Sequence, residues 1–224
     1  MILGIETATT ACAAGLADSE RSVESLLARD RRHVEVLVPG IQSLLAAWPA
    51  TLRDVTRIVV DYGPGLFTGL RVGVATARAL AEATGAELVG VTSLEIYATQ
   101  AAARGVSGPV VAVVDGRRGE LFAQRFALGD AVVALDAPHV VRPGDLVAGA
   151  TGATPVTFVG DGAIRYAGDL AAVPGATCLG IAWPSPETAM ALGARRDPAP
   201  VHPLYVREAD AVANFATRSR PWPG

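Results

Sequence analysis

The sequence contains no lysine, because all nineteen of its basic residues are arginine. Schiff-base catalysis needs a lysine amine and a P-loop needs a lysine beside its phosphates, so both chemistries are excluded. Cysteine is also scarce: Cys12 and Cys178 lie far apart and lack the CxxC spacing of a zinc or redox motif. We therefore expect neither a zinc site nor a disulfide framework.

The sequence also has no excess of positive charge. The formal net charge is -3 and the isoelectric point is about 5.6, which disfavours a broad surface for binding phosphate backbones. Aromatic residues make up 5% of the chain and are scattered singly, so no stacking platform for single-stranded nucleic acid is indicated. Any RNA is expected to be held mostly by a partner.

Long uninterrupted hydrophobic runs are absent, although half of the 224 residues are hydrophobic. Each longer apolar stretch is soon interrupted by Arg, Asp or Glu, and the first acid, Glu6, comes without a basic leader before it. We expect a soluble cytoplasmic protein with no membrane contact, large enough to bury one core or two small ones.

The hydrophobic spacing over residues 1–105 predicts an N-terminal lobe with the order βββαβαβα. In it Ser93 is expected to cap the last helix, and Gly85 to end the helix before that. The predicted strands are 2–7, 12–17, 23–29, 57–61 and 87–91, and the predicted helices are 33–48, 67–83 and 93–104.

A Gly/Ser/Pro cluster at 105–109 marks the expected boundary to a smaller C-terminal α/β lobe, residues 106–224. The pattern predicts a hairpin of strands 110–114 and 121–126, a helix at 143–150, a strand at 156–159 and a helix at 187–195. The proline-rich chain beyond Asp197 is predicted to be irregular. Which lobe the last helix joins is left open.

One strand-to-helix turn has the composition of an anion site. Glycines before a helix expose backbone N–H groups at the positive end of the helix dipole. A threonine-rich turn after the first strand and an acidic hairpin tip supply further polar groups. Tight turns, close helix packing through Gly69 and Gly73, and a solvated hairpin explain the same residues and are the more common outcome. The candidate nucleotide or phosphate vicinity is Glu6, Thr7, Gly63, Pro64, Gly65 and Asp115.

Histidine is represented by His33, His139 and His202, which lie too far apart to share local metal-ligand spacing. No Ser/His/Asp or Cys/His arrangement is evident either. We predict no catalytic residue and no metal ligand.

Three segments together resemble one known family. They are ILGIETAT (2–9), GPGLFTGLRVG (63–73) and VVDGRRGE (113–120), in this order along the chain. Arg32-His33 and the PLYVR segment (203–207) add weaker support. The sequence is similar to the TsaB family, formerly called YeaZ, over nearly its whole length, with residues 128–200 matching loosely.

The resemblance implies an α/β fold of two lobes, of the actin-like ATPase and sugar-kinase-like (ribonuclease H-like) type. It also implies a non-catalytic subunit that pairs with its larger homologue TsaD and helps to recruit the ATPase TsaE. TsaD then transfers threonylcarbamoyl to the tRNA adenosine next to the anticodon. A homodimer without TsaD, indirect tRNA contact and no cofactor of its own are further expectations, and a nucleotide at the partner interface is left open.

One departure from TsaD bears on catalysis. In TsaD-like chains the strand matching 87–91 leads into a His-x-x-x-His metal pair, and Ser93 and Tyr97 occupy those two positions here. A hydroxyl and a phenol are weak substitutes for two imidazoles at neutral pH. The resemblance therefore implies that the metal site is lost.

The partner interface is expected on the helices at 33–47 and 67–83, where small residues allow another helix to approach closely. Replacing Gly69 with a bulky residue is expected to weaken assembly more than folding. The predicted interface residues are His33, Val36, Leu37, Leu44, Phe67, Thr68, Gly69, Arg71, Gly73 and Ala77.

Two other functions are weaker alternatives. A stand-alone small-molecule kinase or ATPase of the same fold would use Glu6, Thr7 and the 63–65 turn around phosphate, with Asp115 as the acid. Turnover of ATP by the purified chain would favour it. A metallopeptidase lacks a zinc motif.

Overall fold

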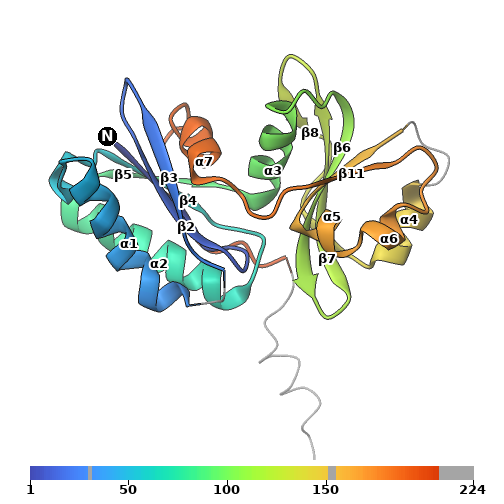
Figure 1. The fold of residues 1–224 in the computed structure, drawn as a ribbon, viewed down its shortest axis with the longest axis horizontal. Helices are drawn as coiled ribbons and strands as arrows, with labels where there is room; N and C mark the ends of the chain where they lie inside the picture. Colours follow the sequence, from blue (N-terminus) through green and yellow to red (C-terminus); the bar gives the residue numbers. More distant parts are fainter. Residues whose placement is uncertain (30–31, 151–154, 207–224) are drawn as a thin grey trace, which may run out of the picture.

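The computed structural model describes residues 1–29, 32–150 and 155–206. Two lobes lie side by side, and each is built around one mixed β-sheet with helices on its faces (Figure 1). Within the described ranges no helix is long and apolar enough to cross a membrane.

The first sheet contains five strands in the order β3-β2-β1-β4-β5. β1 pairs antiparallel with β2, β2 pairs antiparallel with β3, and β4 and β5 continue the sheet in parallel. The carboxyl ends of β1 and β4 therefore meet at the same edge. The strands are β1 (Ile2–Glu6), β2 (Cys12–Ala17), β3 (Ser22–Ala28), β4 (Arg57–Asp61) and β5 (Glu87–Val91).

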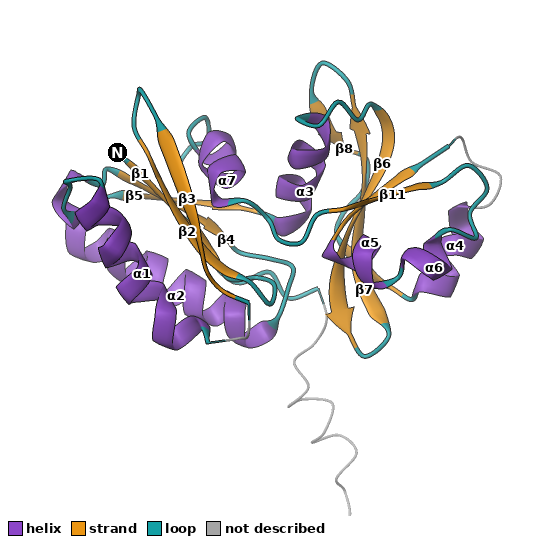
Figure 2. Ribbon diagram, in the orientation of Figure 1, coloured by secondary structure: helices purple, strands orange, loops and turns teal. Residues whose placement is uncertain are grey.

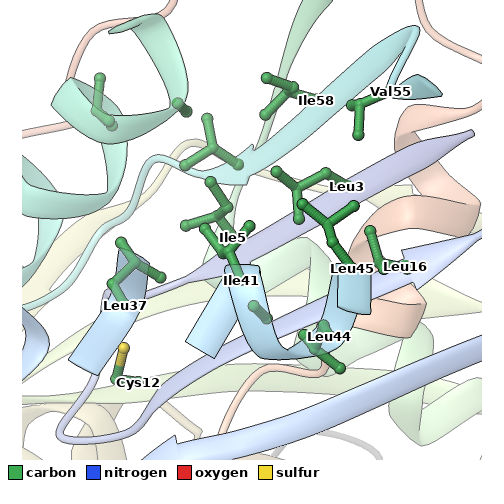
Figure 3. Packing of buried hydrophobic residues seen from close by; sticks show 14 of the residues in the cluster. Leu3, Ile5, Cys12, Leu16, Leu37, Ile41, Leu44, Leu45, Val55 and Ile58 are labelled. Atoms are coloured by element: carbon green, nitrogen blue, oxygen red, sulfur yellow. The ribbon is translucent and has the colours of Figure 1, made fainter. Parts of the chain in front are cut away.

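Helices α1 (His33–Ala47) and α2 (Phe67–Thr84) cover one face of this sheet, and α7 (Pro186–Gly193) covers the other (Figure 2). The α1 and α2 side is a continuous apolar core, in which Leu37 and Ile41 of α1 belong to one cluster with Leu3 and Ile5 of β1 (Figure 3). Gly85 ends α2 in the left-handed conformation, with φ 74°, as predicted.

The second sheet repeats this topology. Its main path is β8-β7-β6-β10-β11, with antiparallel pairs around β7 and parallel pairs from β6 through β10 to β11. β9 also pairs with β7. Both lobes thus share one order and one set of strand directions. The strands are β6 (Gly108–Arg117), β7 (Glu120–Leu128), β8 (Val132–Ala134), β9 (His139–Val141), β10 (Thr157–Gly160) and β11 (Thr177–Gly180).

Helices cover both faces of the second sheet. α3 (Ser93–Ala102) packs on one face through Leu94, Tyr97, Ala98 and Ala101. On the other face lie α4 (Pro143–Ala150), α5 (Asp161–Arg165) and α6 (Ala167–Leu170). A short 3-10 helix, η1 (Leu52–Asp54), precedes β4 in the first lobe.

The lobe boundary differs from the predicted one at residue 105. α3 belongs by packing to the second lobe, while its Ile96 also reaches the first-lobe cluster around Val59 and Val91. α7 returns to the first sheet, where Met190 lies over Gly4 and Gly15. The chain therefore crosses between the lobes after β5 and again before α7, which local hydrophobic spacing does not reveal.

The cap of α3 also differs from the prediction. Thr92, and not Ser93, caps the helix: its hydroxyl accepts the N–H of Glu95 at 3.1 Å, and Glu95 Oε2 accepts the N–H of Thr92 at 3.0 Å. Ser93 is the first helical residue, so its hydroxyl is free to bond elsewhere.

Candidate functional site at the junction of the lobes

The two most distinctive sequence motifs form one packed unit. Thr7, after β1, donates its hydroxyl to the carbonyl of Gly69 in α2 at 2.8 Å. The N–H of Leu66 donates to the carbonyl of Ala8 at 2.7 Å. A Cβ on Gly69 would lie 2.0 Å from the carbonyl oxygen of Thr7, so only glycine allows this approach.

This packing corrects one expectation about Gly69. Its backbone rests on Thr7 of the same chain, and its residue surface is buried. A bulky replacement would collide with fixed backbone inside the lobe, so it is expected to damage folding first. Gly73 is similar, because a Cβ there would lie 2.1 Å from the hydroxyl oxygen of Thr7.

The polar groups proposed to surround a phosphate are largely engaged with one another. The side chain of Thr7 is fully buried and bonded to Gly69. The N–H of Gly63 donates to Asp61, and the carbonyl of Pro64 accepts from Ser93. In the described structure these three groups stabilise the turn itself, as the tight-turn explanation of the sequence expects.

Two carboxyl groups lie at the adjacent ends of β1 and β4. Glu6 and Asp61 follow the paired residues Ile5 and Val60, and neither side chain is exposed to solvent. Burial raises the pKa of Glu6 well above its usual range, and the neighbouring Asp61 raises it further. Burial also raises the pKa of Asp61. Asp61 is a site residue that the sequence analysis did not identify.

The two residues at the His-x-x-x-His positions are both buried at this junction. Ser93 Oγ lies 2.8 Å from Asp61 Oδ1 and 2.9 Å from the carbonyl oxygen of Pro64. Tyr97 is fully buried and its hydroxyl has no hydrogen-bond partner within the described residues. Burial, followed by the charge of Asp161, raises the pKa of this phenol well above its usual range.

Asp115 belongs to the second lobe, near the end of β6. Its carboxyl pairs with Arg117 at 3.1 Å and with Arg165 at 3.5 Å, and its N–H donates to Asp161 Oδ1 at 3.1 Å. Asp161 follows β10 between two glycines. Burial, and to a smaller extent the charge of Asp115, raise its pKa to about 6, against the N–H bonds it accepts. The Gly-Asp-Gly sequence at 160–162 could have indicated Asp161 as a site residue, but the sequence analysis did not identify it.

The predicted partner residues divide between the core and the surface. Six of them are buried in the first lobe, where Leu37 and Ala77 contribute to its apolar core and His33 bonds the carbonyl of Ala11 at 2.9 Å. Their side chains do not form an outer surface, which corrects that part of the prediction. The buried residues are His33, Leu37, Leu44, Gly69, Gly73 and Ala77; Val36 is half-buried, and Phe67, Thr68 and Arg71 are exposed.

An exposed apolar face nevertheless lies on these helices. Val34 and Val38, four residues apart on α1, are 72% and 44% exposed. At the start of α2 the guanidinium of Arg71 lies 3.8 Å from the ring centre of Phe67 and donates to the hydroxyl of Tyr205 at 3.0 Å. We call these five residues the helix face. The sequence analysis did not identify Val34, Val38 and Tyr205 as surface residues, because the spacing of apolar residues indicates only which side of a helix faces the core.

Metal ligation has no evident support in the described parts of the chain. They contain no group of three or more His, Cys, Asp or Glu residues arranged to hold an ion. His33 and His139 approach backbone carbonyls in different lobes, so they share no site.

Comparisons with known proteins agree with this architecture. A family model described as TsaD, tRNA N6-adenosine threonylcarbamoyltransferase, matches residues 27–166. An uncharacterized protein of Mycobacterium tuberculosis is 36% identical over 216 residues, which cover 94% of this chain and 93% of that protein. The tRNA threonylcarbamoyladenosine biosynthesis protein TsaB of Escherichia coli is 31% identical over 121 residues, 54% of this chain and 52% of that protein.

A solved structure shows the same fold. The structure titled YeaZ from Pseudomonas aeruginosa has a TM-score of 0.75 and 25% identity, and the match covers 86% of this chain and 90% of that one. The fold is the expected α/β one with two lobes, and it is shared with that YeaZ structure. The chain belongs to the family of the TsaD model, in its TsaB/YeaZ-like branch. This branch takes part in the biosynthesis of threonylcarbamoyladenosine in tRNA.

Proposed function

We propose that this chain is the non-catalytic subunit of a tRNA adenosine threonylcarbamoyltransferase complex in the cytoplasm. In this proposal it pairs with a TsaD homologue, helps to recruit a TsaE ATPase and contacts tRNA indirectly. The family supports the pathway, since the TsaD model matches residues 27–166 and the Escherichia coli relative is named a tRNA threonylcarbamoyladenosine biosynthesis protein.

The single observation that carries the proposal is that Ser93 and Tyr97 are both buried and engaged within the chain. The resemblance to TsaD-like chains implies that those chains have a pair of metal-binding histidines at these two positions. Here the hydroxyl of Ser93 lies within 2.8 Å of Asp61 Oδ1, and the ring of Tyr97 is part of the second-lobe core. A serine bonded inside the protein and a buried phenol with a raised pKa are poor ligands for a divalent metal.

The same geometry argues against a stand-alone kinase or ATPase. Such an enzyme needs polar groups that are open to phosphates, whereas Thr7 bonds Gly69 and the turn at Gly63 bonds Asp61. The nearby Glu6 is buried without exposure. We therefore propose that the chain has no cofactor of its own, and that any nucleotide is bound jointly with the partner.

The helix face is the proposed surface for TsaD. It combines exposed valines with a Phe67, Arg71 and Tyr205 cluster, and aromatic and arginine side chains are enriched at the energetic centres of protein interfaces. Without TsaD, two copies would pair through the same face, because a two-fold contact needs one self-complementary patch.

Sedimentation velocity with and without a TsaD homologue tests the proposal. We expect a homodimer for the purified chain, and a heterodimer when TsaD is added at equal concentration. Val38→Asp places a charge on the helix face and is expected to abolish both species. Val133→Asp is the matched control, since Val133 is 52% exposed but lies in the second lobe. A chain that stays monomeric alone and with TsaD would contradict the proposal.

A further inference from the structure

Glu6 and Asp61 each leave one carboxyl oxygen without a donor. Glu6 Oε1 accepts the N–H of Ala8 at 2.9 Å, and Asp61 Oδ1 accepts the N–H of Gly63 at 2.8 Å. Glu6 Oε2 and Asp61 Oδ2 are buried and have no hydrogen-bond donor in the part of the chain that the structure describes. Glu6 and Asp61 follow the directly paired residues Ile5 and Val60, so the two carboxyls are neighbours. Because an orphaned buried acceptor is costly, this arrangement calls for a donor shared by the pair.

The side chains around the pair do not supply a compensating positive charge. The charge of Glu95, on α3, acts on Asp61, and the phenol of Tyr97, also on α3, lies within the influence of Glu6, Asp61 and Asp161 of α5. Each of these groups is acidic, so it adds negative charge or none. Two bare carboxylates in this setting would repel each other with no solvent to screen them.

The available cations are engaged elsewhere. Arg196, which follows α7, pairs with Glu95 at 2.8 Å, beside the phenol of Tyr62. Arg71, at the start of α2, bonds Tyr205. Among the described residues, no cation is a main cause of the pKa shift of either carboxyl. A proton is the smallest group that satisfies both open oxygens.

We propose that Glu6 and Asp61 share a single proton, and that this proton is a structural part of the junction between the lobes. One carboxyl is neutral and donates its O–H to the free oxygen of the other, so the pair carries one negative charge. The chain takes this proton from water on folding and releases it when the pair separates. The hydroxyl of Ser93 bonds the same Asp61, which connects the proton to α3.

The direction of the pKa shifts supports this arrangement and fixes its pH dependence. Burial, then the charge of Asp61, raise the pKa of Glu6. An acid with a raised pKa in the native state binds more protons there than in the unfolded chain. Its stabilising contribution is full below the ordinary glutamate range, about pH 4, and is lost as the pH rises through the native pKa.

Loss of the shared proton would affect the connection between the lobes. Two charges at the ends of β1 and β4 would repel each other, and the resulting displacement of Asp61 would strain the hydrogen bond that Ser93 donates to it. α3 begins at Ser93 and packs into the second lobe through Leu94 and Tyr97. We therefore expect alkaline pH to loosen the attachment of α3 before it affects the cores.

The test compares wild type with Glu6→Gln and Asp61→Asn by thermal unfolding across the pH range. Each amide keeps the shape and supplies a permanent N–H donor to the facing oxygen. We expect the Tm of both variants to equal or fall slightly below wild type at acidic pH, and to exceed it by a few degrees at alkaline pH. Glu82→Gln, on the exposed side of α2, is the control and should follow wild type throughout.

Infrared spectroscopy of the wild-type protein gives a second readout that does not depend on a variant folding. We expect the carbonyl band of a neutral, buried carboxyl at neutral pH, and its loss in Glu6→Gln. Absence of this band in wild type would overturn the proposal, and so would variants that follow wild type at every pH. Stabilisation of wild type but not Glu6→Gln by Mg²⁺ would also overturn it, since a metal ion would then occupy the place of the proton.

Discussion

Thr7 donates its hydroxyl to the backbone carbonyl of Gly69 over 2.8 Å, which joins the end of β1 to the first turn of α2. The same side chain lies against Gly73, one turn further along the helix. Gly69 and Gly73 of the 63–73 motif are therefore explained by contact between the helix and the loop after β1 inside the lobe. A partner helix is not needed to account for them.

Gly73→Ala is expected to destabilise the protein by about 1–3 kcal/mol. The new Cβ would lie 2.1 Å from Thr7 Oγ1, and the threonine cannot turn away without losing its bond to Gly69. Urea unfolding followed by circular dichroism measures the loss. Gly168→Ala is the control, because nothing lies near its added Cβ and alanine favours the helix. Equal stability of the Gly73 variant and wild type would contradict this packing.

Arg57→Gln is expected to loosen α7 and to cost about 1–3 kcal/mol of stability. One terminal nitrogen of Arg57 donates to the carbonyls of Gly193, Ala194 and Arg196, at 2.8, 3.1 and 3.0 Å. These carbonyls end α7, and the arginine stabilises them as a cap from β4. Hydrogen exchange should accelerate in α7 first, before β4 is affected.

The control for Arg57 is Arg125→Gln, which removes an exposed pair with Asp136 and should cost at most about 1 kcal/mol. If both variants lose the same stability, or if exchange in α7 is unchanged, the capping role of Arg57 is wrong.

Asp161→Asn is expected to stabilise the protein increasingly between about pH 4 and pH 6. Burial raises the native pKa of Asp161 to about 6, so the wild type loses stability as the pH rises through that value. Asparagine avoids the buried charge and still accepts the N–H of Asp115. The gain should reach about 3 kcal/mol above pH 6 and then stay constant.

Chemical unfolding at several pH values measures this effect. Asp130→Asn, an exposed site on the turn before β8, is the matched control and should show no such pH dependence. A gain that is equal at pH 4 and pH 8 would show that Asp161 is not the titrating group.

Phe67→Ala is expected to weaken pairing with a TsaD homologue by at least about tenfold, or 1.4 kcal/mol, while the unfolding free energy changes less. The ring of Phe67 is partly exposed and supports Arg71 and Tyr205, with the two ring centres 5.1 Å apart. Isothermal calorimetry gives the affinity. Ile164→Ala, on the exposed surface of α5, is the control. Unchanged affinity in the Phe67 variant would exclude the helix face.

Much of the first lobe was predictable because its strands and helices have regular hydrophobic spacing. The strands at 12–17, 57–61 and 87–91 were confirmed at their predicted bounds, and the helices beginning at His33 and Phe67 start as predicted. The second lobe was harder. β8, β9, β11, α5 and α6 are three to five residues long, too short for a period to develop, and were missed.

The candidate site was predictable in part. The motifs around Thr7 and Gly69 were identified, but their contact spans 62 positions in sequence, and no local pattern indicates which backbone each glycine faces. Val34 and Val38 were overlooked because apolar periodicity marks the buried side of a helix. The described tail residues 198–206 are irregular, as predicted, and the prediction for 207–224 falls outside the described residues.

A reconstituted modification assay tests the central claim most directly. The chain is co-expressed with a TsaD homologue and TsaE in a host whose own copies are deleted, and the modified adenosine in its tRNA is quantified by mass spectrometry. We predict product when all proteins are present, and none when this chain is omitted or when TsaD is omitted. Formation of the modified nucleoside by this chain without TsaD would contradict the account.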